Sequence, residues 1–197
     1  MAVVAALLAT GGVSEAKDRA GEKAFRGDGT LFRSYPMPLF IGRWLECGYG
    51  VAFGSFPTGS EHEAEYEIGP LPDRLDRNFE VVLALDGANG RLEEGWSADF
   101  VIEDAGGTVV LRSEDVDGGS WPGGGFTHVF QMLPEWRKRR VSGWEYIFSA
   151  PMGGTNLRPA AFKAQPGQRY RVKVRYSPGT GAPETQGHFE IRQPVWM

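Results

Sequence analysis

The chain has 197 residues, of which 41% are hydrophobic, and a formal net charge of −4. This length suits one domain with a full-sized core, and the negative charge excludes a global attraction to nucleic acid or to anionic lipid. The single cysteine, Cys47, excludes an intrachain disulfide and a cysteine-rich metal site. The 28 glycines and 13 prolines follow no repeat, so they predict many turns between short strands.

Residues 1–16 resemble the hydrophobic and cleavage regions of a secretory signal peptide. An apolar run from Val3 to Ala9 is followed by the small-residue pattern Ser14-Glu15-Ala16, although no lysine or arginine precedes Lys17. We therefore expect export to the periplasm or the cell exterior, with 1–16 as a signal-peptide remnant. The alternative is an apolar tail at the end of the domain. No other stretch approaches the ~20 apolar residues of a membrane span.

The next segments lead into a single domain. Residues 17–38 mix charges, glycine and proline with isolated aromatics, which predicts an extended lead-in to one sandwich domain over 39–197. Between Leu39 and Phe56 the apolar residues are interrupted by glycines. As a strand, this segment has one nearly bare face and one bulky face, made by Cys47, Tyr49, Val51 and Phe53. We favour packing of the bare face under a bulky neighbour over a ligand groove.

Two segments far apart in the chain carry complementary charges at every second residue. From Glu61 to Ile68, four glutamates alternate with His62, Ala64, Tyr66 and Ile68; from Arg169 to Tyr176, four bases alternate with tyrosine and valine. This period of two indicates half-buried strands. Opposite charges on paired strands contribute roughly 0.2–1 kcal/mol each, so we predict that the two strands are neighbours, or one strand apart, with solvated charges. Alternatively, each stripe is independently solvated or recruits a charged partner.

The remaining apolar segments also alternate, and none has a sustained helical pattern. About nine short strands separated by turns predict an all-β, antiparallel two-sheet sandwich. The further predicted strands are 79–85, 126–132, 144–148, 189–191 and a hairpin of 98–102 with 109–111 that turns at Asp104–Gly107.

The run from Phe162 to Val174 contains Pro166-Gly167 followed by Tyr170 and Val172. It resembles the late strand of immunoglobulin-like and fibronectin-type sandwiches, in which a Pro-Gly turn precedes a buried tyrosine that bonds back to the backbone. The resemblance covers about a dozen residues and implies a fold class without implying a function. The cysteine pair of antibody domains is absent, and jelly-roll or carbohydrate-binding sandwiches stay open as alternatives.

Tryptophans and a basic run form the predicted partner-binding set. Trp121 stands in a Ser-Trp-Pro-Gly-Gly-Gly loop, and Trp136 is followed directly by four bases. An exposed ring offers stacking area for sugars or an anchor for a protein partner, and the bases can hold an anionic partner. The alternatives are a loop that closes one end of the sandwich and a solvated connection. The predicted set is Trp121, Trp136, Arg137, Lys138, Arg139 and Arg140.

The sequence offers only weak candidates for a metal site. Asp115 and Asp117 could supply oxygen ligands to calcium, but the other positions of an EF-hand loop are missing. The alternative is a solvated acidic loop. No pair of histidines has the spacing of a helical zinc site.

Catalytic candidates are equally sparse. The histidines are His62, His128 and His188, each on a separate predicted strand, and we expect them to be structural because no nucleophile motif surrounds Cys47 or any serine. The acidic residues Glu93, Glu94 and Asp99 could form a carboxylate pair for glycosidic chemistry.

Together these features predict a non-enzymatic, exported sandwich that recognises a protein partner through an end loop or a sheet face. The first alternative is a carbohydrate-binding sandwich that could bind calcium; apart from that, no cofactor is expected. The second is a small hydrolase, which a pocket joining a histidine to a carboxylate or to Cys47 would favour. Nucleic-acid binding is not expected, because the net charge is negative and no recognition motif accompanies the basic run.

Overall fold

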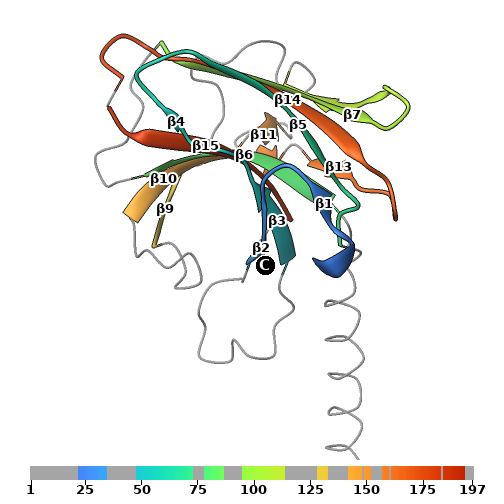
Figure 1. The fold of residues 1–197 in the computed structure, drawn as a ribbon. Coiled ribbons are helices and arrows are strands. Elements are labelled where there is room, and N and C mark those ends of the chain that lie inside the picture. The colour runs from blue at the N-terminus through green and yellow to red at the C-terminus, as the bar shows by residue number, and fades with distance from the viewer. Residues whose placement is uncertain are drawn as a thin grey trace, which may run out of the picture.

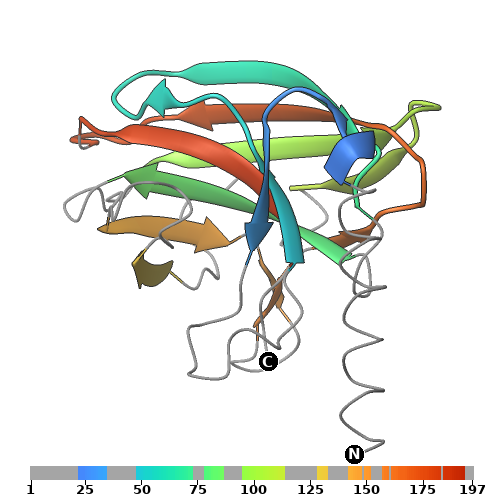
Figure 2. The ribbon, with the colours of Figure 1, turned by 60° about the horizontal axis from the view of Figure 1, so that its bottom comes forward.

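The structure is a computed structural model in which two antiparallel sheets stack face to face (Figures 1 and 2). It describes residues 22–34, 48–72, 78–86, 95–113, 128–132, 142–147, 149–151, 157–159, 161–182 and 184–193. Fifteen strands occur in these residues, and several of them have only two or three residues. The predicted all-β, antiparallel two-sheet sandwich is confirmed.

The first sheet has five strands, and its order is β1 (Arg26–Gly27), β5 (His62–Gly69), β14 (Tyr170–Ser177), β7 (Ser97–Asp104) and β8 (Val109–Arg112). The hairpin of β7 and β8 is the one predicted from the Asp104–Gly107 turn. Asp104 Oδ1 closes that turn by accepting the N–H groups of Gly106 and Thr108 at 2.8 and 2.9 Å.

The second sheet has the order β2 (Thr30–Ser34), β3 (Gly48–Ala52), β15 (Gln186–Arg192), β6 (Asn78–Asp86), β10 (Ser142–Ile147) and β9 (His128–Met132). The short strands β4 (Phe56–Pro57) and β13 (Ala161–Lys163) pair with β15 and β6. A separate pair is formed by β11 (Ser149–Pro151) and β12 (Leu157–Pro159). Since β1 and β2 come from the predicted lead-in, the sandwich includes the described part of that segment.

The core lies between the sheets and follows the period of two. On β14 the tyrosines and valines are buried while Arg171 and Arg175 are exposed, as predicted. Buried residues of β6, β7 and β15 complete the core, including Phe79, Val81, Leu83, Leu85, Ala98, Phe100, Ile102, Phe189 and Ile191. Burial of these apolar side chains is the main force that holds the two sheets together.

The bare face of β3 packs under a bulky neighbour, as predicted. The ring of Phe32 on β2 lies against Gly50, and a Cβ at this glycine would overlap the ring. Tyr49 and Val51 are fully buried on the other face of the strand. Cys47 lies outside the described residues.

The turn before β14 has the geometry that the Pro166-Gly167 sequence predicted. The hydroxyl of Tyr170 accepts the backbone N–H of Gln165 at 2.6 Å, and the tyrosine ring packs against Phe162 with centroids 5.1 Å apart. Burial raises the pKa of Tyr170, and the charge of Asp104 raises it further, while the hydrogen bond from Gln165 acts in the opposite direction. The tyrosine that bonds back to the backbone is thus present.

Candidate functional site

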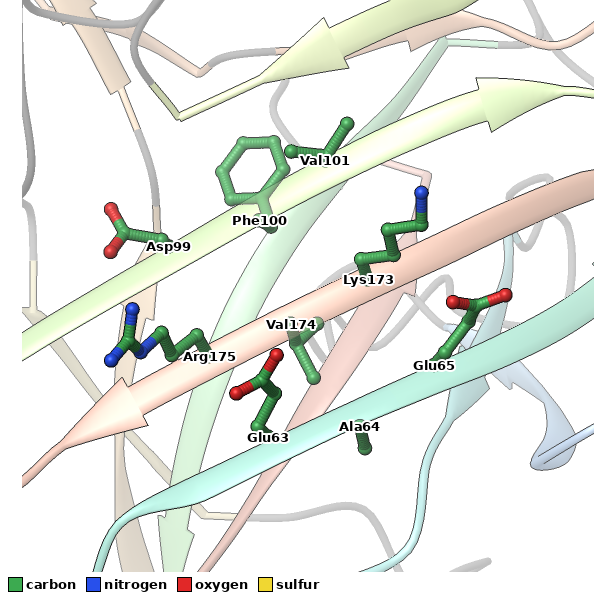
Figure 3. Close-up of a pocket in the computed structure, with 9 residues that line it drawn as sticks. All are labelled: Glu63, Ala64, Glu65, Asp99, Phe100, Val101, Lys173, Val174 and Arg175. Atoms are coloured by element: carbon green, nitrogen blue, oxygen red, sulfur yellow. The ribbon is translucent and has the colours of Figure 1, made fainter. Parts of the chain in front are cut away.

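The outer face of the five-stranded sheet carries three rows of charge. The row on β14 pairs in register with β5 on one side and with β7 on the other, so that Lys173, for example, lies opposite Glu65. We call this surface the charged face; it consists of Glu63, Glu65, Glu67, Arg171, Lys173, Arg175, Asp99 and Glu103 (Figure 3 shows part of it). The prediction that the acidic and basic strands are neighbours with solvated charges is confirmed.

Ion pairs on this face connect all three strands. Arg171 Nε lies 3.0 Å from Glu65 Oε1, and the guanidinium is also 3.9 Å from both Glu67 and Glu103. Lys173 Nζ donates to Glu103 Oε1 at 2.8 Å. The side chains of Arg171 and Lys173 are 47% and 43% exposed, so each pair contributes about 0–1 kcal/mol at most.

A shallow hollow of about 340 Å³ lies where the three rows meet, between Glu63, Asp99 and the bases of β14. Figure 3 shows Arg175 between Asp99 and Glu63, with its guanidinium extending toward Asp99. Within the described part of the chain, neither Arg175 nor Glu63 forms an ion pair within 4 Å. These two side chains are therefore available to a partner without the loss of an internal ion pair.

Negative charge is in surplus on this face, because β5, β14 and β7 present five carboxylates and three bases there. A further base, Arg112 on β8, lies on the same face opposite Val101 at the far edge. The surplus is therefore concentrated on β5, where Glu65 and Glu67 have side chains 53% and 62% exposed. Three of the five carboxylates of this face thus lie on β5, while the exposed bases Arg26 and Arg169 lie beside its Gly69 end.

The outer face of the second sheet carries a different cluster, which we call the buried quartet: Glu80, His188, Glu190 and Arg192. Arg192 Nε donates to Glu80 Oε1 at 3.0 Å, and Arg192 Nη1 lies 3.8 Å from Glu190 Oε2. His188 Nε2 lies 2.8 Å from Glu190 Oε1. The side chains of Glu80 and Glu190 are at most 1% exposed, and those of Arg192 and His188 are 8% and 14% exposed. Solvent therefore hardly screens these charges.

Sequence reasoning missed the quartet, although a signal was present. Glu80 stands alone between Phe79 and a run of valines, leucines and alanine, in a strand that is buried on both faces. A single carboxylate inside such a run is a signal for a buried ion pair, because an isolated buried charge is too costly. Its partner, Arg192, comes from a strand more than a hundred residues away.

Two histidines are described with their side chains. The ring of His62 stacks on Phe56 with centroids 4.2 Å apart, and burial lowers its pKa. His188 contacts the carboxylate of Glu190, and this contact is part-buried. His128 lies on β9. The expectation of structural roles stays a prediction.

Most of the predicted site residues lie outside the described residues. These are Trp121, Trp136, Arg137, Lys138, Arg139, Arg140, Asp115, Asp117, Glu93 and Glu94, so the structure does not test them. Asp99 is described: it lies on β7 and accepts the hydroxyl of Ser113 at 3.3 Å. In the part of the chain that the structure describes, no three His, Cys, Asp or Glu side chains are grouped as a metal site.

Comparison with protein families, with curated proteins and with solved structures finds no match to this chain. The described residues include no helix with the length and hydropathy of a membrane span.

Proposed function

We propose that the protein is an exported, non-enzymatic binding module that recognises a protein partner rich in lysine or arginine through the charged face. The observation that carries this proposal is the surplus of exposed carboxylate on β5. A partner that supplies cations opposite Glu63, Glu65 and Glu67 would balance this charge. Export is supported by the resemblance of residues 1–16 to a signal peptide.

The internal ion pairs of the charged face are compatible with binding. Exposed pairs in high dielectric are weak, and the long side chains of Arg171 and Lys173 can exchange one carboxylate for another. Complementary charge mainly accelerates association and selects the partner, whereas affinity depends on the contacts made afterwards. The proposed interaction is therefore sensitive to salt.

The finer fold type is also part of the proposal. The hydrogen bond from Gln165 to the hydroxyl of Tyr170 supports an immunoglobulin-like sandwich. The same local feature occurs on unrelated sandwiches, so it supports the fold type and says nothing about the partner. The carbohydrate and calcium alternatives depend on Trp121, Asp115 and Asp117, which lie outside the described residues.

An oligolysine peptide tests the proposal, with an oligoglutamate peptide of equal length as the control. We expect titration calorimetry at low salt to show binding of oligolysine only, and we expect the affinity to fall as sodium chloride is added. Replacing Glu63, Glu65 and Glu67 together with glutamine should weaken this binding about tenfold or more, since each lost charge pair contributes up to about 1 kcal/mol.

The matched control variant is Glu184→Gln, which removes an exposed carboxylate from the loop before β15. It should bind oligolysine as the unaltered protein does, within about twofold. Equal binding by the triple variant, or no binding of oligolysine by the unaltered protein, would contradict the proposed function.

A further inference from the structure

We infer that the partner binds as an extended strand that adds to the free edge of β5, with basic and apolar residues alternating along it. This inference rests on the proposed function and specifies how the partner is held. Figure 2 shows β5, in teal at the top of the view, as the outermost long strand of its sheet. The short strand β1 pairs only with Ile68 and Gly69. In the described part of the chain, no strand pairs with this edge between His62 and Tyr66.

The backbone groups of Glu63 and Glu65 point out of this edge. The backbone groups of Glu67 point to the β1 side of β5. The carbonyl of Glu67 accepts the N–H of Asp28 at 2.6 Å, and its own N–H donates to Asp28 Oδ2 at 2.8 Å. In an antiparallel strand, residues two apart direct their N–H and C=O groups to the same side. Glu63 and Glu65 therefore present two donors and two acceptors to an incoming strand.

The pairing of β1 with β5 ends after Gly27. Gly27 has a φ of 125° and lies so close to the carbonyl of Glu67 that any Cβ would clash with it. After this residue Asp28 caps Glu67, and the chain leaves the edge of β5 to enter β2. Among the residues that the structure describes, none pairs with the edge next to Glu63 and Glu65, whereas β1 covers that of Ile68 and Gly69.

The side chains along this edge specify the partner's chemistry. Glu63 and Glu65 are exposed on the outer face, where lysine or arginine at alternate positions would meet them. On the inner face, His62, Ala64 and Tyr66 are only partly buried, and Tyr66 stacks on Phe53 with centroids 4.2 Å apart. Apolar residues at the other positions of the partner would cover them. β14 already shows this pattern on the opposite edge of β5.

The same residues select against a second copy of the chain. Pairing of β5 with β5 would place glutamates opposite glutamates, and like charges directly across a ladder are destabilising. The other edge of the sheet is less suitable for strand addition. Its strand β8 exposes Val109 and Val110 at 43% and 38%, but a shift in register bends it there, and such bulges disturb an edge.

The test uses three peptides of about seven residues, near the usual strand length. The first alternates lysine with valine, the second has the same sequence with N-methyl groups on the residues that would pair, and the third alternates glutamate with valine. We expect the first peptide to bind, N-methylation to weaken binding about tenfold or more, and the third peptide not to bind. Hydrogen exchange should show protection of the Glu63 and Glu65 amides by the first peptide only.

A substitution maps the binding to this edge. Glu63→Lys, which breaks no ion pair among the described residues, should weaken binding of the first peptide about fivefold or more, while Glu184→Lys should leave it unchanged. Equal binding of the N-methylated peptide, with no protection at Glu63 and Glu65, would overturn strand addition and leave the proposed function standing. Failure of both the lysine–valine peptide and oligolysine to bind would overturn both.

Discussion

The two outer faces of the sandwich carry the same kinds of charged side chain, but these are exposed to solvent on one face and buried on the other. On the charged face, Arg171, Lys173, Glu65 and Glu67 are about half exposed, while Glu103 is 16% exposed, and ion pairs between such exposed side chains form and break at little cost. In the buried quartet, arginine, histidine and glutamate are almost fully enclosed. Enclosed charges depend on their partners, because water cannot replace a partner that is lost. The quartet is therefore expected to contribute to stability, whereas the charged face can carry the proposed binding at little cost to the fold.

The largest expected effect is the removal of Arg192. Arg192→Met leaves Glu80 and Glu190 buried without the guanidinium that contacts both, which should lower the free energy of unfolding by about 3–5 kcal/mol. Urea unfolding followed by circular dichroism measures this change. The matched control is Arg171→Met on the charged face, where we expect a loss below about 1 kcal/mol. Similar losses in both variants would remove the contrast between the two faces.

A smaller effect is expected from tightening the packing around Gly50. The Cβ of Gly50→Ala would meet the ring of Phe32 and the Cβ of Arg192, and such overpacking costs about 1–3 kcal/mol. Gly54→Ala is the control, since a Cβ there has no neighbour within 4 Å. Thermal unfolding of the two variants checks the prediction. A Gly50→Ala protein as stable as the unaltered protein would show that Phe32 and Arg192 can move to accommodate the added methyl group.

The ion pairs of the charged face should contribute still less to the free energy of unfolding. Lys173→Met removes the contact with Glu103, and the free energy of unfolding should fall by no more than about 1 kcal/mol. The difference between the variant and the unaltered protein should shrink further at high salt, because exposed charges are screened. A large loss that persists at high salt would show that this face is structural.

The smallest effect concerns pH. Burial holds the pKa of His62 below its ordinary value of 6.5, so the unfolded chain binds a proton more readily than the folded protein. This contribution to stability is complete above pH 6.5 and is lost as the pH falls below that value. His62→Phe keeps a ring against Phe56 and should lessen the fall in stability below pH 6.5. An unchanged pH profile would contradict this role of His62.

The position and the two faces of a strand were predictable from the sequence where one face is exposed to solvent and the other is buried. The alternation of Glu61–Ile68 and Arg169–Tyr176 predicted two strands, their faces and their pairing in one sheet. The pairing was predictable because oppositely charged side chains stabilise paired strands, whereas like charges destabilise them. The register itself was not predicted: Arg171 lies opposite Glu67, and Arg175 lies opposite Glu63. Register depends on the turns between strands, and sequence alternation alone does not supply it.

The candidate site was less predictable, for two physical reasons. The quartet joins β6 to β15, and no local pattern links residues so far apart in the chain. The open edge of β5 depends on where β1 stops, and two-residue strands such as β1 leave no periodic signal. The predicted partner-binding residues around Trp121 and Trp136 lie outside the described residues and stay predictions.

The charged face is proposed to serve binding, and it is expected to contribute little to the free energy of unfolding. The most direct test is one variant, Glu63→Gln with Glu65→Gln, measured twice: by urea unfolding and by titration with the lysine–valine peptide. We predict that the free energy of unfolding changes by less than about 1 kcal/mol while the affinity for the peptide falls about fivefold or more. A strongly destabilised protein, or an unchanged affinity for the peptide, would contradict the proposed division of roles between the two faces.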